Sequence, residues 1–296
     1  MPRVFAQPKI KRKAKMKKPA PVPEIGVISV LRPDAANLKT VADFGFKCAQ
    51  VSSWDMSLAT SETAKALGKA SRDLGVRLTA IWGGYSGPLA WNFTRGPVTL
   101  GLVPVAYRKR RIEELKRWAD FAAEAGAPAV ITHCGFLPEN MTDPEFELVA
   151  VAIQEVAEYC KKLGLGFWFE TGQETPVVLL RYIEEIATGN LGINLDPANL
   201  IMYGKGNPLD ALRVFGKYVR AIHAKDGMPP TEGRHLGAEV KVGTGCVRYP
   251  EFIPALLECG FTGDLTIERE IGGDAQIRDI RDTAALLRRL LAKATR

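Results

Sequence analysis

The chain has 296 residues, of which 46% are hydrophobic and 25% are charged, the proportions of an ordinary globular protein. No apolar run approaches the roughly 20 residues that a membrane-spanning helix needs, which argues against a membrane protein. The formal net charge of +7 comes from the N-terminal segment, because residues 1–23 hold eight basic residues and no acidic one.

Residues 1–23 combine this charge run with repeated prolines, a composition typical of a disordered extension. The segment lacks the apolar stretch of a secretory signal. One interpretation is weak attachment to nucleic acid or an anionic surface; a solvated leader is the interpretation that charge runs favour, so no specific nucleic acid partner is expected. Residues 24–296 are close to neutral and are predicted to form one domain. Five cysteines without paired spacing predict reduced thiols in a cytoplasmic protein.

Strand-like and helix-like segments alternate after this extension. Eight short apolar runs are typical of buried parallel strands. They lie at residues 26–30, 47–52, 77–82, 129–133, 166–170, 192–196, 220–223 and 265–268. The clearest helical patterns lie between them and at the end of the chain, at residues 108–125, 146–163 and 278–294. This series predicts an α/β fold with one (β/α)8 TIM barrel domain. An open doubly wound sheet would need a glycine-rich loop after the first strand, where Leu31-Arg32-Pro33-Asp34 stands instead.

Four polar side chains end the last four predicted strands: Glu170, Asp196, His223 and Glu268. The carboxyl ends of barrel strands meet on one face, so these side chains are expected to converge there. Three carboxylates would repel one another unless a cation lay between them. Each residue alone has another explanation, and Asp196 before Pro197 also suits a helix N-cap. Together they predict one divalent metal ion, which the ligand types leave open among Mn, Mg, Co and Zn.

Such a site predicts an enzyme that acts on a small carbohydrate. The ion would polarise a carbonyl and stabilise the enediolate formed when the neighbouring C–H loses its proton. Glu170 and Glu268 come from well-separated strands and are the predicted acid and base. Proton return to the same carbon gives epimerisation, and return to the adjacent carbon gives isomerisation.

Further residues near the strand ends are candidates for substrate binding: Trp82, His133, Glu174 and Lys225. Glu174 is as compatible with a solvent-facing loop, and Lys225 with an ion pair to Asp226. Residues 83–104 form the longest connection without clear periodicity. We expect this segment to cover the substrate, with Trp82, Tyr85 or Trp91 as an apolar wall; the alternative is a surface loop whose aromatic side chains plug the barrel rim.

Several motifs resemble those of xylose-isomerase-like barrel proteins, usually called sugar phosphate isomerases/epimerases. They are His223-Ala224-Lys225-Asp226, Gly243-Thr244-Gly245, and the run from Cys259 to Glu268. The resemblance spans roughly residues 24–294. It implies a single divalent metal, often manganese, held at the positions of Glu170, Asp196, His223 and Glu268. It also implies that the two glutamates are the acid and base in ketose 3-epimerase members.

The chain departs from those 3-epimerases at two positions. They carry a histidine where this chain has Asn199, kept here as a candidate substrate-binding residue, and an arginine where it has Pro229. A lyase or dehydratase acting on a keto-sugar, keto-glycoside or inosose is therefore the alternative, and a non-catalytic carbohydrate-binding barrel is the second. The related endonuclease IV branch needs many histidine ligands, and three histidines cannot supply them. Barrels of this kind often associate, so a homo-oligomer is left open.

Overall fold

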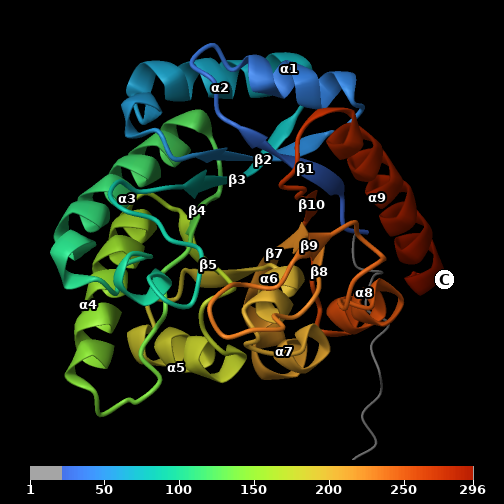
Figure 1. The fold of residues 1–296 in the computed structure, drawn as a ribbon. Helices are drawn as coiled ribbons and strands as arrows, with labels where there is room; N and C mark the ends of the chain where they lie inside the picture. The colour runs from blue at the N-terminus through green and yellow to red at the C-terminus, as the bar shows by residue number, and fades with distance from the viewer. Residues whose placement is uncertain (1–21, 296) are drawn as a thin grey trace, which may run out of the picture.

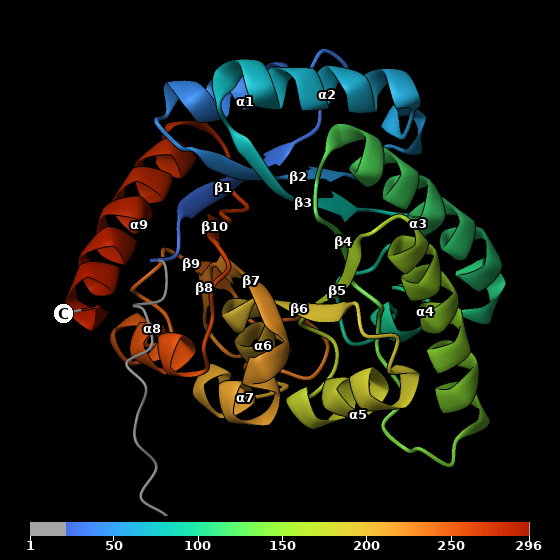
Figure 2. The same ribbon diagram turned by 180° about the vertical axis from the view of Figure 1, so that it is seen from behind.

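The computed structural model describes residues 22–295, so the predicted disordered extension lies outside the described residues except for its last two. The described chain forms a closed barrel of parallel strands in the order β1-β10-β7-β6-β5-β4-β3-β2. Figures 1 and 2 show the helices as an outer ring around these strands. The predicted (β/α)8 TIM barrel is therefore confirmed. Within residues 22–295, no helix is long and apolar enough to cross a membrane.

The eight barrel strands agree with the predicted ones to within one residue at each end. They are β1 (Ile25–Val30), β2 (Cys48–Ser53), β3 (Arg77–Gly83), β4 (Ala129–Thr132), β5 (Gly166–Glu170), β6 (Leu191–Leu195), β7 (Val219–Ala224) and β10 (Leu265–Ile267). A short antiparallel pair that the sequence did not predict, β8 (Asp226–Gly227) and β9 (Glu239–Val240), follows β7.

The helices follow the strands in the order expected for a barrel. They are α1 (Ala36–Asp43), α2 (Ser61–Leu74), α3 (Val105–Ala125), α4 (Pro144–Lys162), α5 (Pro176–Ile186), α6 (Pro197–Met202), α7 (Pro208–Phe215), α8 (Tyr249–Glu258) and α9 (Gly273–Ala294). Within residues 22–295, short 3-10 helices lie at Met56–Leu58, Gly96–Val98 and Gly216–Tyr218. Helix α9 begins five residues before its predicted start, because its polar first turn carries no apolar stripe.

Local sequence explains how these helices are placed. In α3, the side chains of Ile112, Leu115 and Trp118 recur at helical spacing and are buried against the barrel. The helix ends at Gly126, whose φ of 81° favours a residue without a side chain. Helix α4 begins at the N-cap Asp143, whose carboxylate accepts from the Glu145 amide. Such signals fix where each helix stops and the next strand begins.

The loop between β3 and α3 is held down by a buried arginine. Arg111 is fully buried, and its guanidinium donates to the carbonyl oxygens of Ser86 (3.2 Å), Pro88 (3.2 Å) and Gly101 (2.7 Å). Its guanidinium carbon lies 4.3 Å from the centre of the Tyr85 ring. One side chain thus joins both ends of the segment that was expected to cover the substrate.

Replacing Arg111 by methionine should lower the free energy of unfolding by about 2–4 kcal/mol, because three carbonyl groups lose a charged donor. Denaturant titration measures this difference. The Arg110→Met variant is the matched control, since the Arg110 side chain is 54% exposed one position away. Equal stability of the two variants would show that Arg111 does not brace the loop.

Candidate metal centre

The four predicted ligands meet at the carboxyl end of the barrel. Glu170 is the last residue of β5, Asp196 follows β6 directly, His223 lies near the end of β7, and Glu268 follows β10. One donor atom from each lies within 4.8 Å of the others, and all four side chains are largely buried. The convergence expected from their strand-end positions is therefore present.

Asp196 presents its two carboxylate oxygens to different surroundings. It is the N-cap of α6, with its Oδ1 accepting from the Asn199 amide at 2.9 Å. Its Oδ2 is buried and has no hydrogen-bond partner among residues 22–295, although the Lys225 Nζ lies 3.8 Å away. Burial raises the pKa of this carboxyl well above its ordinary value. Capping of α6 occupies Oδ1, so Oδ2 would be the oxygen left to hold a metal ion, and the two alternatives offered by the sequence are compatible.

His223 lies at the centre of the cluster. Its Nδ1 is 3.0 Å from Glu170 Oε1 and 3.1 Å from Glu268 Oε2. Burial alone would lower the pKa of this imidazole, but the two carboxylates outweigh burial and raise the pKa well above its ordinary value. Without a metal ion, a proton on Nδ1 therefore takes the place between the two carboxylates.

Each catalytic candidate has a further donor. The Trp82 indole N–H donates to Glu170 Oε2. The side-chain amide of Asn199 donates through its Nδ2 to Glu170 Oε1 at 3.4 Å. The Lys225 ammonium lies 3.3 Å from Glu268 Oε2 and 2.8 Å from Glu270 Oε2. Burial opposes ionisation of both carboxyls, yet the cationic neighbours lower the pKa of Glu170 and of Glu268. Both are therefore carboxylates at neutral pH.

A cavity of about 510 Å³ opens onto the cluster. Its wall includes Glu170 and Glu268 together with four of the predicted substrate-binding residues, Trp82, His133, Asn199 and Lys225. The cavity has the size of a small-molecule site. The structure thus brings these candidates to one space, where their predicted contacts with a substrate can be tested.

Indole rings form one side of this cavity. Trp54, Trp82 and Trp91 line it, with ring centres 4.8 Å apart for Trp54 and Trp82 and 5.9 Å apart for Trp54 and Trp91. Tyr85, by contrast, is buried beneath the loop, where its hydroxyl accepts from the Gly101 amide at 2.7 Å. The expected apolar wall therefore includes Trp82 and Trp91 but not Tyr85. Trp54 was not among the residues expected from the sequence, although it follows directly after β2 and so lies at a strand end.

Glu174 does not line this cavity. The side chain is buried, and its Oε1 has no hydrogen-bond partner in the described part of the chain. Burial raises the pKa of Glu174 to about 8. The carboxyl is therefore neutral at pH 7, and the side chain is buried rather than facing solvent.

Glu174 should make the folded protein less stable at alkaline pH. Its pKa is raised on folding, so its stabilising effect is complete below about pH 4.5 and is lost as the pH rises toward 8. A Glu174→Gln variant should match the wild type at pH 5 and exceed its unfolding free energy by about 2–4 kcal/mol at pH 8.5. Denaturant titrations at both pH values test this, with exposed Glu184→Gln as control. A pH-independent difference would contradict it.

Two other features of the described chain resemble ligand sites, a second cluster of possible metal ligands and a surface hollow, but neither has the properties of the cluster at the barrel end. Glu24, Cys48 and Asp264 also gather, but the Arg77 guanidinium already donates to Asp264 (2.8 and 2.9 Å) and Glu24 (3.0 Å). Burial raises the pKa of the Cys48 thiol to about 12, which disfavours the thiolate that a metal needs.

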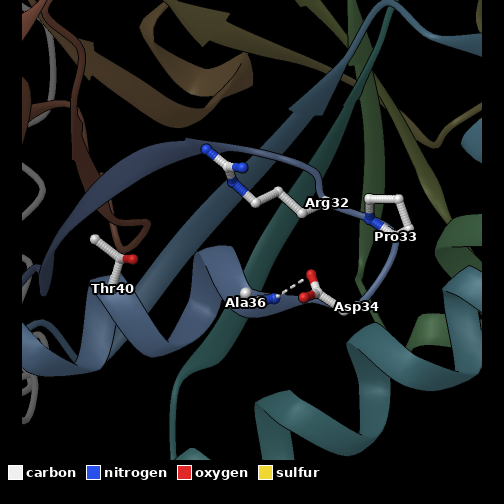
Figure 3. A pocket seen from close by; sticks show the side chains of 5 residues that line it. All are labelled: Arg32, Pro33, Asp34, Ala36 and Thr40. Atoms are coloured by element: carbon white, nitrogen blue, oxygen red, sulfur yellow. Dashed lines mark hydrogen bonds between the residues drawn. The ribbon is translucent and has the colours of Figure 1, made fainter.

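The second feature is a hollow of about 540 Å³ on the loop between β1 and α1 (Figure 3). Five exposed residues from this single segment line it: Arg32, Pro33, Asp34, Ala36 and Thr40. Asp34 is the one acidic side chain among them, and its Oδ1 accepts from the Ala36 amide at 3.1 Å. The hollow therefore lacks the group of carboxylate and imidazole side chains that meets at the barrel end.

The cluster at the barrel end fits a divalent cation. It supplies three carboxylates and one imidazole, hard donors that suit Mn, Mg or a similar ion. The buried Asp196 Oδ2 has no hydrogen-bond partner among the described residues, and a cation would satisfy it. The buried cluster could therefore hold a metal, and its donor types do not choose the ion.

Comparison with known proteins places this barrel in a family. Residues 38–290 match the family described as xylose isomerase-like TIM barrel. The chain belongs to the xylose isomerase-like TIM barrel family. A xylose isomerase domain protein from Planctomyces limnophilus is 36% identical, with a TM-score of 0.87 over 93% of this chain and 99% of that protein.

Two further proteins are similar to this chain at lower identity. A xylose isomerase-like TIM barrel protein from Mycobacterium smegmatis, solved in complex with magnesium, is 19% identical, with a TM-score of 0.66 over 93% of this chain and 98% of that one. An uncharacterized protein of Methanocaldococcus jannaschii is 28% identical over 182 residues, 57% of this chain. The match spans 59% of the length of that relative.

Proposed function

We propose that this protein is a divalent-metal-dependent isomerase or epimerase of a sugar, acting by proton abstraction next to a carbonyl group. The observation that carries the proposal is the convergence of Glu170, Asp196, His223 and Glu268 at a cavity of about 510 Å³. An L-ribulose 3-epimerase and a 3-keto-D-glucoside 4-epimerase share the fold at 19% and 17% identity, which supports the choice of chemistry without deciding it.

The four ligands would hold one ion beside the cavity wall. When bound, such an ion supplies Lewis-acid stabilisation of negative charge on a substrate oxygen. Glu170 and Glu268 would move the proton: one carboxylate takes it from the carbon next to the carbonyl, and the other returns a proton that it first acquires from solvent. Trp82 and Lys225 orient these two carboxylates through the hydrogen bonds that they donate. Trp54 and Trp91 would cover the apolar face of the substrate and exclude water from it.

A lyase or dehydratase acting on a keto-sugar is the second candidate, and Lys225 is the observation that favours it. Its ammonium group is buried at the cavity wall, where it could protonate a leaving hydroxyl or alkoxide. Asn199 and Pro229 stand where ketose 3-epimerases carry a histidine and an arginine. These two departures count against the ketose 3-epimerase reaction. A probable 3-DHS dehydratase from Bacillus anthracis, 16% identical, shares the fold.

Incubation with keto-sugars and 3-keto-glycosides in D₂O tests both candidates. We expect the Mn²⁺-supplemented protein to place deuterium at the carbon next to the carbonyl of at least one substrate. Conserved mass apart from deuterium indicates isomerisation or epimerisation, whereas loss of water or of the aglycone indicates elimination. Binding of a sugar without exchange would contradict catalysis and favour a non-catalytic carbohydrate-binding barrel.

A further inference from the structure

A buried glutamine on the far side of the barrel contacts the imidazole of the metal cluster. Gln50 lies in β2, has no exposed surface, and its Oε1 is 2.6 Å from His223 Nε2. Strands β2 and β7 are not neighbours in the barrel, so the two side chains meet across its interior. Gln50 was not among the residues expected from the sequence, although it is a polar residue within the apolar run of β2.

The chemistry of this contact determines where His223 carries a proton. An amide oxygen only accepts hydrogen bonds, so His223 Nε2 must be the donor. In a neutral imidazole the other nitrogen, Nδ1, then carries the lone pair. This is the nitrogen that lies between Glu170 Oε1 and Glu268 Oε2, at 3.0 and 3.1 Å. The amide of Gln50 thus selects the tautomer that leaves Nδ1 available as a ligand.

A third strand orients the amide of Gln50 itself. Its Nε2 lies 3.4 Å from Asn194 Oδ1, on β6. If the amide turned over, its NH₂ group would face His223 Nε2, which would then have to accept. The single proton of the neutral ring would move to Nδ1 and block the ligand position.

We propose that Gln50 is a positioning residue, which holds the His223 ring with its proton on Nε2 and so reserves Nδ1 for the metal ion. This inference rests on the proposed metal site and adds to it a residue that does not touch the ion. Partners of this kind, which hydrogen-bond the outer nitrogen of a ligand histidine, fix both ring orientation and tautomer in metal sites.

Three proteins test the proposal: the wild type, Gln50→Met and Gln50→Glu. Methionine keeps the length of the side chain but cannot accept comparably, whereas glutamate keeps an accepting oxygen. Titration with Co²⁺, followed by its visible absorption, and calorimetric titration with Mn²⁺ give the affinities. We expect Gln50→Met to bind both ions about 10–100-fold more weakly, and Gln50→Glu to stay within about fivefold of the wild type. Gln154→Met on α4 is the surface control and should bind as the wild type does.

Nitrogen-15 spectra of histidine-labelled protein loaded with Zn²⁺ read the tautomer directly, and the chain has only three histidines to assign. We expect a His223 ring that is protonated at Nε2 and ligated through Nδ1 in the wild type. A proton on Nδ1 would overturn the proposal even if Gln50→Met failed to fold, as would equal affinities for wild type and Gln50→Met. If the wild type binds no ion, both this proposal and the proposed function are refuted. If both Gln50 variants lose affinity, Gln50 acts through packing and not through its hydrogen bond to His223, which also contradicts the proposal.

Discussion

Glutamine in place of Glu170 or Glu268 should lower the rate of proton exchange by about 10²–10⁴-fold, the usual contribution of a positioned acid or base. The two variants should differ in which substrate they fail to process. If the carboxylates act on opposite faces of the carbon, each variant blocks proton removal from one epimer and leaves partial exchange of the other. The cationic neighbours that lower the pKa of both carboxyls keep them ionised before the reaction.

Deuterium exchange measures this effect. Mn²⁺ is kept at saturation because both residues are also proposed ligands, and weaker metal binding must not be mistaken for slower proton transfer. Glu270→Gln is the matched comparison, because Glu270 lies two residues beyond Glu268, is 61% exposed and does not belong to the ligand cluster. Exchange rates within about threefold of the wild type in both single variants, well below a typical acid–base contribution, would contradict their assignment as acid and base.

Metal affinity should rise steeply with pH, by up to about tenfold per pH unit while a ligand proton must be displaced. His223 is the reason. Its pKa is raised by Glu170 and Glu268, so the metal-free protein holds the His223 proton at neutral pH, and an ion must displace it. The raised pKa of Asp196 acts in the same direction. The affinity should level off only above the folded-state pKa values of both groups.

Calorimetric titration with Mn²⁺ in two buffers of different ionisation enthalpy counts the protons released on binding. We expect about one or more per ion near pH 7, and fewer as the pH rises. The Glu174→Gln variant is the control, because burial raises the pKa of Glu174 to about 8 but this residue lies outside the ligand cluster. An affinity that does not change between pH 6 and pH 8 would show that His223 is not protonated in the metal-free protein.

The fold could be predicted from the sequence because its signals are local. Each barrel strand is a short apolar run, and helices such as α3 carry a buried stripe that ends at a glycine. Strand ends in a parallel barrel converge, so the positions of Glu170, Asp196, His223 and Glu268 were enough to predict their meeting. The β8–β9 pair was not predictable in this way, since each strand has only two residues.

Several contacts around the site could not be predicted, because they depend on tertiary packing, although four of the predicted substrate-binding residues do line the cavity. Gln50 meets His223 only when the barrel closes, and the Lys225 ammonium reaches Glu268 and Glu270 only when β7 and β10 pair. Glu174 lies only four residues beyond Glu170, yet its side chain is buried and does not line the cavity. Strand-end position predicts the face of the barrel but not the direction of each side chain.

Metal content of the purified protein tests the central claim most directly. Elemental mass spectrometry of the wild type should find about one divalent ion per chain after supplementation with Mn²⁺, and a Glu268→Gln variant should hold much less. This result would support the four-ligand centre on which the proposed catalysis depends. A wild type without bound metal after the same treatment would contradict the account and favour a sugar-binding barrel without metal-assisted chemistry.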